Sequence, residues 1–242
     1  MCLDGLCETL CDVLFPRRCP VCGEIVAPRG GLICPGCAGK LDVVRQPVCK
    51  KCGREMLDKS AEYCIDCRRR GRSFDGGMAL IKYNETARHS MAAIKYKNRR
   101  EYLDFYAAAI DRRFGAKAAG LCADALVPVP LHRSRRRTRG YNQAEELAAR
   151  LSRCWRIPLD TRLLIRKKKT LPQRDLGAGE RLRNLQQAFA MDPRRKTPVP
   201  ESVILVDDIY TTGSTMEACC RVLKQAGVRR VYVLSVCIGY ER

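Results

Sequence analysis

The sequence predicts an α/β protein, a doubly wound and mostly parallel β-sheet preceded by a small zinc-binding domain. Two observations lead to this prediction. Residues 1–71 hold four CxxC pairs at regular spacing, and from about residue 72 apolar runs of strand length alternate with segments of helical periodicity. Such alternation is typical of a parallel sheet that binds its ligands at the carboxyl ends of the strands. We therefore expect two domains, 1–71 and 72–242.

Eight cysteines of the first domain have the spacing of metal ligands. The CxxC pairs start every 15 residues and are Cys19/Cys22, Cys34/Cys37, Cys49/Cys52 and Cys64/Cys67. Glycine follows the second cysteine in CPVCG and CKKCG, where the missing Cβ leaves room for a turn whose N–H groups face the sulfurs. Because tetrahedral zinc takes four soft ligands, eight thiolates predict two structural zinc sites with no open coordination position.

The even spacing permits two ways of sharing the metals. Consecutive pairs could bind one zinc each, first with second and third with fourth, or the pairs could interleave. Consecutive pairing closes shorter loops, which costs less chain entropy, and it is the arrangement that we expect.

The 16 cysteines would also suit a secreted disulfide scaffold, but other features argue against that class. The N-terminal stretch MCLDGLCETLCDVLFP carries acids and lacks the basic start and long apolar core of a signal peptide. No stretch approaches the roughly 20 apolar residues of a membrane span. We therefore expect a cytoplasmic protein without membrane insertion, whose clustered cysteines bind metal rather than form disulfides.

The positive charge is concentrated in the second domain. The formal net charge is +20; residues 1–70 hold 12 Lys and Arg against 9 Asp and Glu, and residues 71–242 hold 34 against 17. A basic surface can serve solubility alone. Its concentration in one domain favours a polyanionic partner, either nucleic acid or a phosphorylated ligand.

The second domain contains the elements of the predicted sheet in order. Strands are expected over 76–84, 123–130, 203–206 and 230–238, and helices over 85–97, around 102–110, from about 141 and from about 214. The arginine-rich stretch LHRSRRRTRGYNQ, 131–143, is expected to form a loop. Residues 162–191 are expected to form a long polar segment framed by short strands.

The stretch VILVDDIYTTGST has the composition of a phosphate site at a strand end. Four apolar residues precede Asp207 and Asp208, and a turn that opens the next helix follows, made of Thr211, Thr212, Gly213, Ser214 and Thr215. Free N–H groups of such a turn bind phosphate, and the helix dipole favours an anion there. The carboxylates would lie one sugar's width away, where they can accept hydrogen bonds from ribose hydroxyls or hold Mg²⁺.

Two basic segments complete the expected site. One is the arginine-rich loop, and the other is 166–183, which is long enough to act as a lid. A phosphate loop, two carboxylates and two basic segments suit a sugar that carries phosphate at one end and pyrophosphate at the other. The motifs of nucleoside triphosphate and dinucleotide sites, GxxxxGK[ST] and a GxGxxG after a strand, do not occur.

The apolar run, the two acids and the Thr/Gly-rich loop resemble the signature of type I phosphoribosyltransferases. With the cysteine-rich head, RTRGYNQAEELA and TLPQRDL…ERLRNLQQAF, the chain is similar over essentially its whole length to the ComF family, associated with competence and DNA uptake in bacteria. The resemblance implies a type I phosphoribosyltransferase-like fold with an N-terminal double zinc ribbon. It also implies Mg²⁺ and phosphoribosyl pyrophosphate as ligands.

The resemblance also implies roles for single residues. Asp207 and Asp208 would bind the ribose hydroxyls, directly or through Mg²⁺, and the Thr211–Thr215 loop would hold the 5′-phosphate. The pyrophosphate would contact the turn of Val129, Pro130, Leu131, His132 and Arg133, and a mobile loop over 168–181 with Lys168, Arg174 and Arg181 would close over the site. Thr211 stands where enzymes of 6-oxopurine salvage place an acid, which argues against that branch and leaves the acceptor open.

Two functions are compatible with these features. One is a Mg²⁺-dependent glycosyltransferase that acts on phosphoribosyl pyrophosphate. The other is an accessory protein of DNA uptake that holds single-stranded DNA on its basic domain and works with a DNA-uptake helicase. Aromatic residues are sparse, at 6% of the chain, and the candidates for base stacking are Tyr83, Tyr96, Tyr141 and Tyr210.

Overall fold

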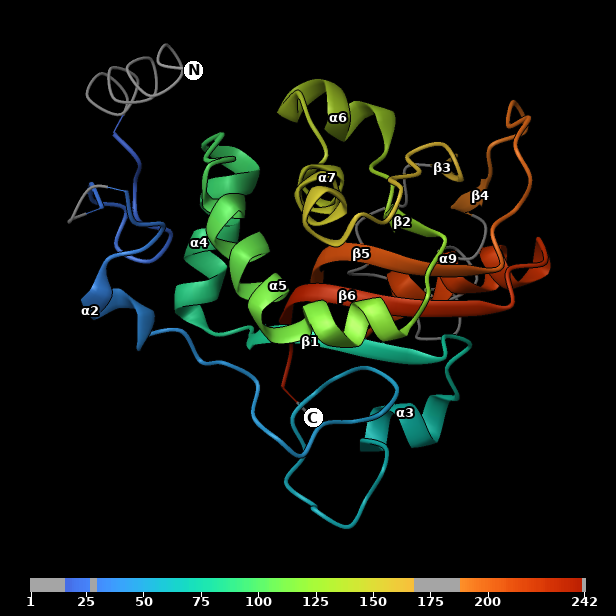
Figure 1. Cartoon of the computed structure of the whole chain (residues 1–242), viewed down its shortest axis with the longest axis horizontal. Helices are drawn as coiled ribbons and strands as arrows, with labels where there is room; N and C mark the ends of the chain where they lie inside the picture. Colours follow the sequence, from blue (N-terminus) through green and yellow to red (C-terminus); the bar gives the residue numbers. More distant parts are fainter. Residues whose placement is uncertain (1–15, 27–29, 168–187, 241–242) are drawn as a thin grey trace, which may run out of the picture.

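A four-stranded parallel sheet lies at the centre of the second domain in the computed structural model, which describes residues 16–26, 30–167 and 188–240 (Figure 1). Its order is β1-β6-β5-β2, and every neighbouring pair is parallel. The strands are β1 (Gly76–Lys82), β2 (Ala125–Pro128), β5 (Ser202–Tyr210) and β6 (Arg230–Ile238). A separate antiparallel pair is formed by β3 (Leu164–Arg166) and β4 (Phe189–Met191). The predicted parallel α/β fold is confirmed.

Helices cover both faces of the sheet because successive strand residues point to opposite sides. On β5, Ile204 and Val206 pack in one apolar core with α4 (Glu85–Tyr96), α5 (Tyr102–Gly120) and α7 (Gln143–Trp155). Val203 and Leu205 pack in a second core, which includes α9 (Ser214–Gln225), β3 and β4. None of the described helices combines the length and the apolar character needed to cross a bilayer.

Side-chain caps explain where two of the helices begin. Asn84 accepts a hydrogen bond from the Ala87 N–H at 2.9 Å, and Asn142 accepts one from the Ala144 N–H at 3.1 Å. Both asparagines therefore satisfy a donor that the first helical turn leaves free. The second cap starts α7 at Gln143, close to the position expected from the sequence.

The arginine-rich stretch, expected to be a loop, contains the short helix α6 (Arg133–Arg139). His132 caps its start by accepting from the Ser134 N–H at 3.2 Å, and Gly140 ends it in the left-handed conformation. An ion pair with an N–O distance of 3.0 Å between Arg136 and Glu145 joins α6 to α7. Because no residue of α6 is buried, it has no apolar periodicity by which sequence analysis could detect it.

Strand β5 is also longer than the apolar run predicts. Pairing with β6 continues past the two acids, from Asp207 opposite Ser235 to Tyr210 opposite Ile238. Both acids therefore lie inside the paired part of the strand and not beyond its end. The cause is the equal length of β6, which supplies hydrogen-bonding partners to the end of β5.

The two cysteine-rich units lie on different sides of the second domain (Figure 1). The unit with α2 (Pro35–Ala38) lies beside α4, where residues 20–23 line a cavity with residues of α4 and with Tyr102. The unit with α3 (Ile65–Arg70) lies against β1 and shares the apolar core on the α9 face of the sheet.

Candidate functional site

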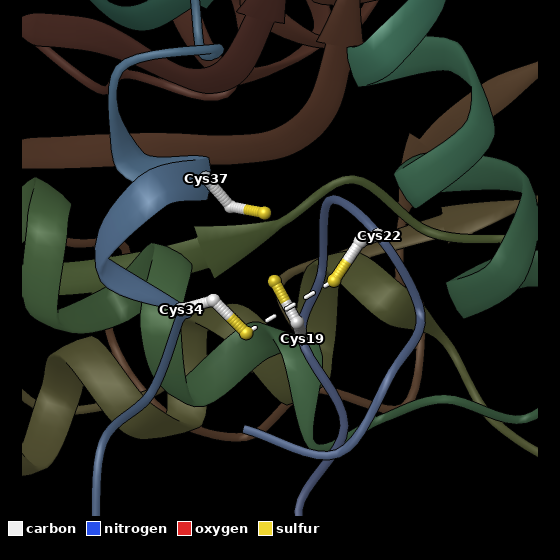
Figure 2. A group of neighbouring side chains, drawn as sticks. All are labelled: Cys19, Cys22, Cys34 and Cys37. Atoms are coloured by element: carbon white, nitrogen blue, oxygen red, sulfur yellow. Dashed lines mark hydrogen bonds between the residues drawn. The ribbon is translucent and has the colours of Figure 1, made fainter. Parts of the chain in front are cut away.

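The eight cysteines form two groups of four, in each of which the sulfur atoms lie within 4.8 Å of one another. Figure 2 shows the first group, whose side chains point toward a common centre. The groups are Cys19, Cys22, Cys34 and Cys37, and Cys49, Cys52, Cys64 and Cys67. Consecutive pairing of the CxxC units is therefore confirmed, and the interleaved arrangement is not present.

The sulfur geometry fits zinc. A tetrahedron with Zn–S bonds of about 2.3 Å has edges of about 3.8 Å. Cys22 Sγ and Cys34 Sγ are 4.0 Å apart, and Cys52 Sγ and Cys64 Sγ are 3.7 Å apart, with all these cysteines free of disulfides. We refer to the unit around the first group as the first ribbon and to the unit around the second group as the second ribbon. Each group supplies all four ligands of a structural zinc site.

Cys19 shows how the turn prepares a thiol to bind metal. Burial by itself raises the pKa of this thiol, but backbone N–H groups, among them that of Val21 at 3.5 Å from Sγ, outweigh burial and lower the pKa to about 7. Zinc binds the thiolate, so these N–H groups favour the form of the side chain that the metal needs.

The two acids near the end of β5 have different surroundings. Asp208 is 4% exposed; its carboxylate forms an ion pair with Lys95 of α4 and accepts a hydrogen bond from Gln143 Nε2 at 3.1 Å. Asp207 is half-buried, points to the opposite face of the sheet, and accepts a hydrogen bond from the Asp208 N–H at 2.9 Å. Asp208 is thus held within the protein, whereas Asp207 remains partly open.

Charge and burial separate the pKa values of this pair. Burial raises the pKa of Asp207, and the negative charge of Asp208 raises it further. For Asp208, burial acts in the same direction, but the charge and hydrogen bond of Lys95 outweigh it and lower the pKa. The pair therefore favours an ionised Asp208 beside an Asp207 that gains a proton easily and would release it to bind a cation.

The predicted phosphate loop, residues 211–215, follows β5 and includes the first two residues of α9; we keep the name phosphate loop for these residues. Its first two threonines are exposed, and the hydroxyls of Thr212 and Ser214 lie 2.9 Å apart. Gly213 has φ of +73°, and a Cβ there would overlap the buried side chain of Tyr210. Only glycine meets both conditions, so the loop closes tightly over the end of the strand.

The turn expected to contact pyrophosphate lies at the same edge of the sheet. Val129 donates its N–H to the Val206 carbonyl at 2.9 Å, and its own carbonyl accepts from Asn142 Nδ2 at 3.0 Å. The turn that follows, 129–133, therefore starts beside the two acids. A cavity of about 530 Å³ opens next to this turn and has the basic lining His132, Arg133, Arg166, Lys167 and Arg194, with Asp192 as its acid.

The structure shows residues at this edge that sequence analysis did not assign to the site. Lys95 and Gln143 come from two helices and meet at Asp208. Arg54 and Arg72, from the second ribbon and the segment after it, donate to carbonyl groups of the phosphate loop. Each of the four is placed at the site by contact with a residue far away in the chain, which no local pattern predicts. The predicted lid residues Lys168, Arg174 and Arg181 lie outside the described residues.

Exposure reduces the set of tyrosines that were expected to stack on bases. Tyr141 and Tyr210 are buried, at 4% and 3% exposure, so they are not available to a base. Tyr96 is 79% exposed, and the Arg139 guanidinium lies 5.5 Å from its ring centroid. Both line a cavity of about 550 Å³ together with Lys95 and Arg135.

A larger cavity, of about 730 Å³, lies at the opposite edge of the sheet, where it is lined by Asp124, Ala125 and Pro200 near the starts of β2 and β5. Ligands of parallel α/β sheets bind at the carboxyl ends of the strands. The candidate site is therefore the edge that carries Asp207, the phosphate loop and the turn after β2.

Known proteins match both parts of the chain. Residues 10–68 match the model of the double zinc ribbon domain, and residues 137–240 match that of the phosphoribosyl transferase domain. Competence protein F of Haemophilus influenzae is 32% identical over 90% of this chain and 96% of its own length. Competence protein ComFC of Bacillus subtilis is 28% identical over 90% and 88%, and DNA utilization protein YhgH of Salmonella typhimurium is 29% identical over 92% and 97%.

Proposed function

Because the chain belongs to the ComF family of competence proteins, we propose that its phosphoribosyltransferase-like domain binds phosphoribosyl pyrophosphate together with Mg²⁺. The observation that carries the proposal is the position of Asp207, near the carboxyl end of β5 and four residues before Thr211, where the phosphate loop that leads into α9 begins. A carboxylate and a helix-opening turn in this order provide for a ribose and its 5′-phosphate at once.

The roles of the two acids follow from their surroundings. Asp207 is partly open and takes the Mg²⁺ or the ribose hydroxyls directly. Asp208 is ionised and fixed by Lys95 and Gln143, so it supports the site electrostatically and reaches the ribose only if the ligand displaces one of these partners. The turn 129–133 and its basic cavity receive the pyrophosphate. Lys168, Arg174 and Arg181 would close over the ligand.

The reaction that suits this site is transfer of the phosphoribosyl group. A nucleophile forms a bond to the anomeric carbon while the bond from that carbon to the pyrophosphate oxygen breaks, and pyrophosphate leaves with the electron pair. Basic side chains at the turn after β2 would stabilise the leaving group. Thr211 disfavours a 6-oxopurine acceptor, and the acceptor is not specified by the residues at this edge.

Isothermal titration calorimetry with phosphoribosyl pyrophosphate and Mg²⁺ tests the proposal. We expect Asp207→Asn to weaken binding by at least about tenfold through loss of one charge-assisted contact, and Asp208→Asn to weaken it less. Asp58→Asn, an exposed acid of the second ribbon, serves as the matched control. The proposal is wrong if the parent protein does not bind, or if the Asp207 variant binds as well as the parent.

A second function, binding of single-stranded DNA, is favoured by the surface around α6. We propose that the exposed arginines of α6 follow the phosphate backbone while the exposed ring of Tyr96 stacks on a base. The family context suggests natural transformation in the cytoplasm, with a DNA-uptake helicase as the partner.

Fluorescence anisotropy with a labelled oligonucleotide tests this second function. Affinity should fall steeply with salt, Tyr96→Ala should cost about 1–3 kcal/mol, and Arg135→Ala should reduce the salt dependence. Tyr240→Ala, which removes another exposed tyrosine, is the control. Absence of binding at low salt would exclude this function. Competition by phosphoribosyl pyrophosphate would show that the two ligands share the edge of the sheet.

A further inference from the structure

Arg54 links the second ribbon to the phosphate loop. It follows Gly53 of the CKKCG turn, is 3% exposed, and contacts two partners with its two terminal nitrogens. Nη1 donates to Asp66 Oδ2 at 2.9 Å, and Nη2 donates to the carbonyl oxygen of Thr211 at 3.1 Å. A buried arginine thus connects a helix of the ribbon with the first residue of the loop.

Arg72 makes the equivalent contact one residue further along the loop. Its Nη2 donates to the carbonyl oxygen of Thr212 at 2.6 Å. In a trans peptide the C=O and the following N–H point in opposite directions. Holding the carbonyls of Thr211 and Thr212 toward these arginines therefore directs the N–H groups of Thr212 and Gly213 the other way. Those N–H groups are the donors that a 5′-phosphate would need.

The second ribbon is fixed firmly enough to hold the loop. A Cβ on Gly77 of β1 would lie 2.5 Å from the Lys51 carbonyl oxygen and 2.8 Å from Cys52 Cα, so the zinc-binding turn packs directly on the strand backbone. Beyond the loop, Ser73 donates its N–H and its hydroxyl to Glu217 of α9, at 2.9 and 2.7 Å. These contacts fix the ribbon to β1 and the segment that follows it to α9, the helix that begins in the loop.

The charge of the second cysteine group supports the position of Arg54. Zinc with four thiolates carries a net charge of about −2. Arg54 follows the ligand Cys52 by two residues, and its guanidinium pairs with the Asp66 carboxylate at 2.9 Å. A buried guanidinium is stable only beside negative charge, so the metal group and Arg54 stabilise each other.

We propose that the second ribbon, and not the first, sets the orientation of the phosphate-loop N–H groups, with Arg54 and Arg72 as positioning residues. The inference rests on the proposed function, since it assumes that the loop receives a 5′-phosphate. Neither arginine touches the ligand. Loss of either arginine lowers the affinity for a ribose phosphate, because the loop must then become ordered when the ligand binds.

NMR relaxation of the zinc-loaded full chain tests, without any ligand, whether the hydrogen bonds of Arg54 and Arg72 order the phosphate loop. Lysine at position 54 keeps the buried charge but has a single nitrogen, so Arg54→Lys retains zinc and loses the contact with Thr211. We expect the order parameters of the Thr212 and Gly213 amides to fall from about 0.85 to below about 0.6 in this variant and in Arg72→Met. Arg18→Lys is the matched control, because Arg18 donates to the Gly23 carbonyl within the first ribbon at 3.1 Å.

Calorimetry on the same proteins tests whether order in the loop affects ligand affinity. With phosphoribosyl pyrophosphate and Mg²⁺, affinity should fall at least about tenfold in Arg54→Lys and stay unchanged in Arg18→Lys. The inference is wrong if the order parameters stay unchanged in both Arg54→Lys and Arg72→Met, or if they fall equally in Arg18→Lys. It is also wrong if the two amides become more mobile while the affinity stays unchanged. A parent protein that does not bind phosphoribosyl pyrophosphate removes the proposed function instead, and the amide order parameters still decide whether the ribbon holds the loop.

Discussion

The two zinc ribbons have nearly the same sequence pattern but different places in the structure. The first has a small apolar core of its own, around Cys19, Val26 and Cys37. All four cysteines of the second belong to the large core on the α9 face of the sheet. In the first ribbon Cys22 is exposed and Cys34 half-buried, whereas every ligand of the second is buried. Equal motifs thus give one peripheral unit and one that shares the core of the domain with the parallel sheet.

A metal-binding motif defines the local fold around the metal but not the part that the unit plays in the whole protein. Both ribbons fit a tetrahedral site equally well, because four cysteines and two turns are sufficient for that. What differs is the surface on which each ribbon packs. The first lies on α4 and near Tyr102, and the second lies on β1 and reaches the phosphate loop.

The two ribbons should differ most in the stability that the protein loses when one zinc ligand is replaced. Cys52→Ser should destabilise the protein by more than about 4 kcal/mol, since structural zinc binding contributes directly to folding and this site lies in the main core. Cys22→Ser should cost less than about 2 kcal/mol, because its ribbon can open without exposing the sheet. Denaturant unfolding with zinc analysis measures both. Equal losses would contradict the distinction between the ribbons.

A glycine pair tests the packing of the ribbons separately from the metal. Gly77→Ala should cost about 3 kcal/mol or more, because its Cβ would meet the backbone of the second ribbon at 2.5 Å. Gly36→Ala in α2 of the first ribbon should be neutral or stabilising, because outside its own helix a Cβ there meets no described atom within 4 Å. Thermal unfolding of the two variants gives the comparison, and a silent Gly77→Ala would show that the second ribbon is not packed on β1.

The link between Ser73 and α9 should depend on pH. Burial raises the pKa of Glu217, but hydrogen bonds from Ser73 and Arg221 outweigh it, so the folded pKa lies below the usual 4.5. The resulting stability is fully present above pH 4.5 and is lost as pH falls through the folded pKa. Glu217→Gln should therefore cost about 2 kcal/mol at pH 7 and progressively less below pH 4.5.

Urea unfolding of both proteins across this pH range measures the difference. Release of zinc in acid affects the parent and the variant alike, so the difference between them isolates Glu217. A difference that stays constant with pH would mean that the carboxylate charge plays no part in this link.

The smallest effect is expected where the first ribbon meets α5. Arg17 pairs with Asp104 at 2.5 Å, but both side chains are about one-third exposed, at 39% and 32%. Arg17→Ala should cost less than about 1 kcal/mol, as do most pairs that water screens. Denaturant unfolding measures it, and a loss above about 2 kcal/mol would show that the first ribbon is more firmly integrated than we infer.

Periodicity and motif spacing predicted much of the fold. Apolar runs predicted the four parallel strands, and the CxxC pairs predicted two groups of four cysteines, because both depend on residues near one another in the chain. Helix α6 was missed because none of its residues is buried, so that it gives no apolar pattern. The extension of β5 through Asp207 to Tyr210 was missed because its length depends on β6, not on its own residues.

Local sequence was enough to predict the ligand types: thiolates in fours for zinc, and a carboxylate shortly before a helix-opening turn for the proposed ribose phosphate. These follow from local chemistry, since the donors of each group are close in the chain or recur at fixed spacing. Local sequence could not predict that Lys95 and Gln143 hold Asp208 and leave Asp207 partly open, nor that Arg54 of the second ribbon contacts the phosphate loop. Those answers depend on contacts between residues far apart in the chain, and such contacts form only when the sheet brings its carboxyl edge and the second ribbon together.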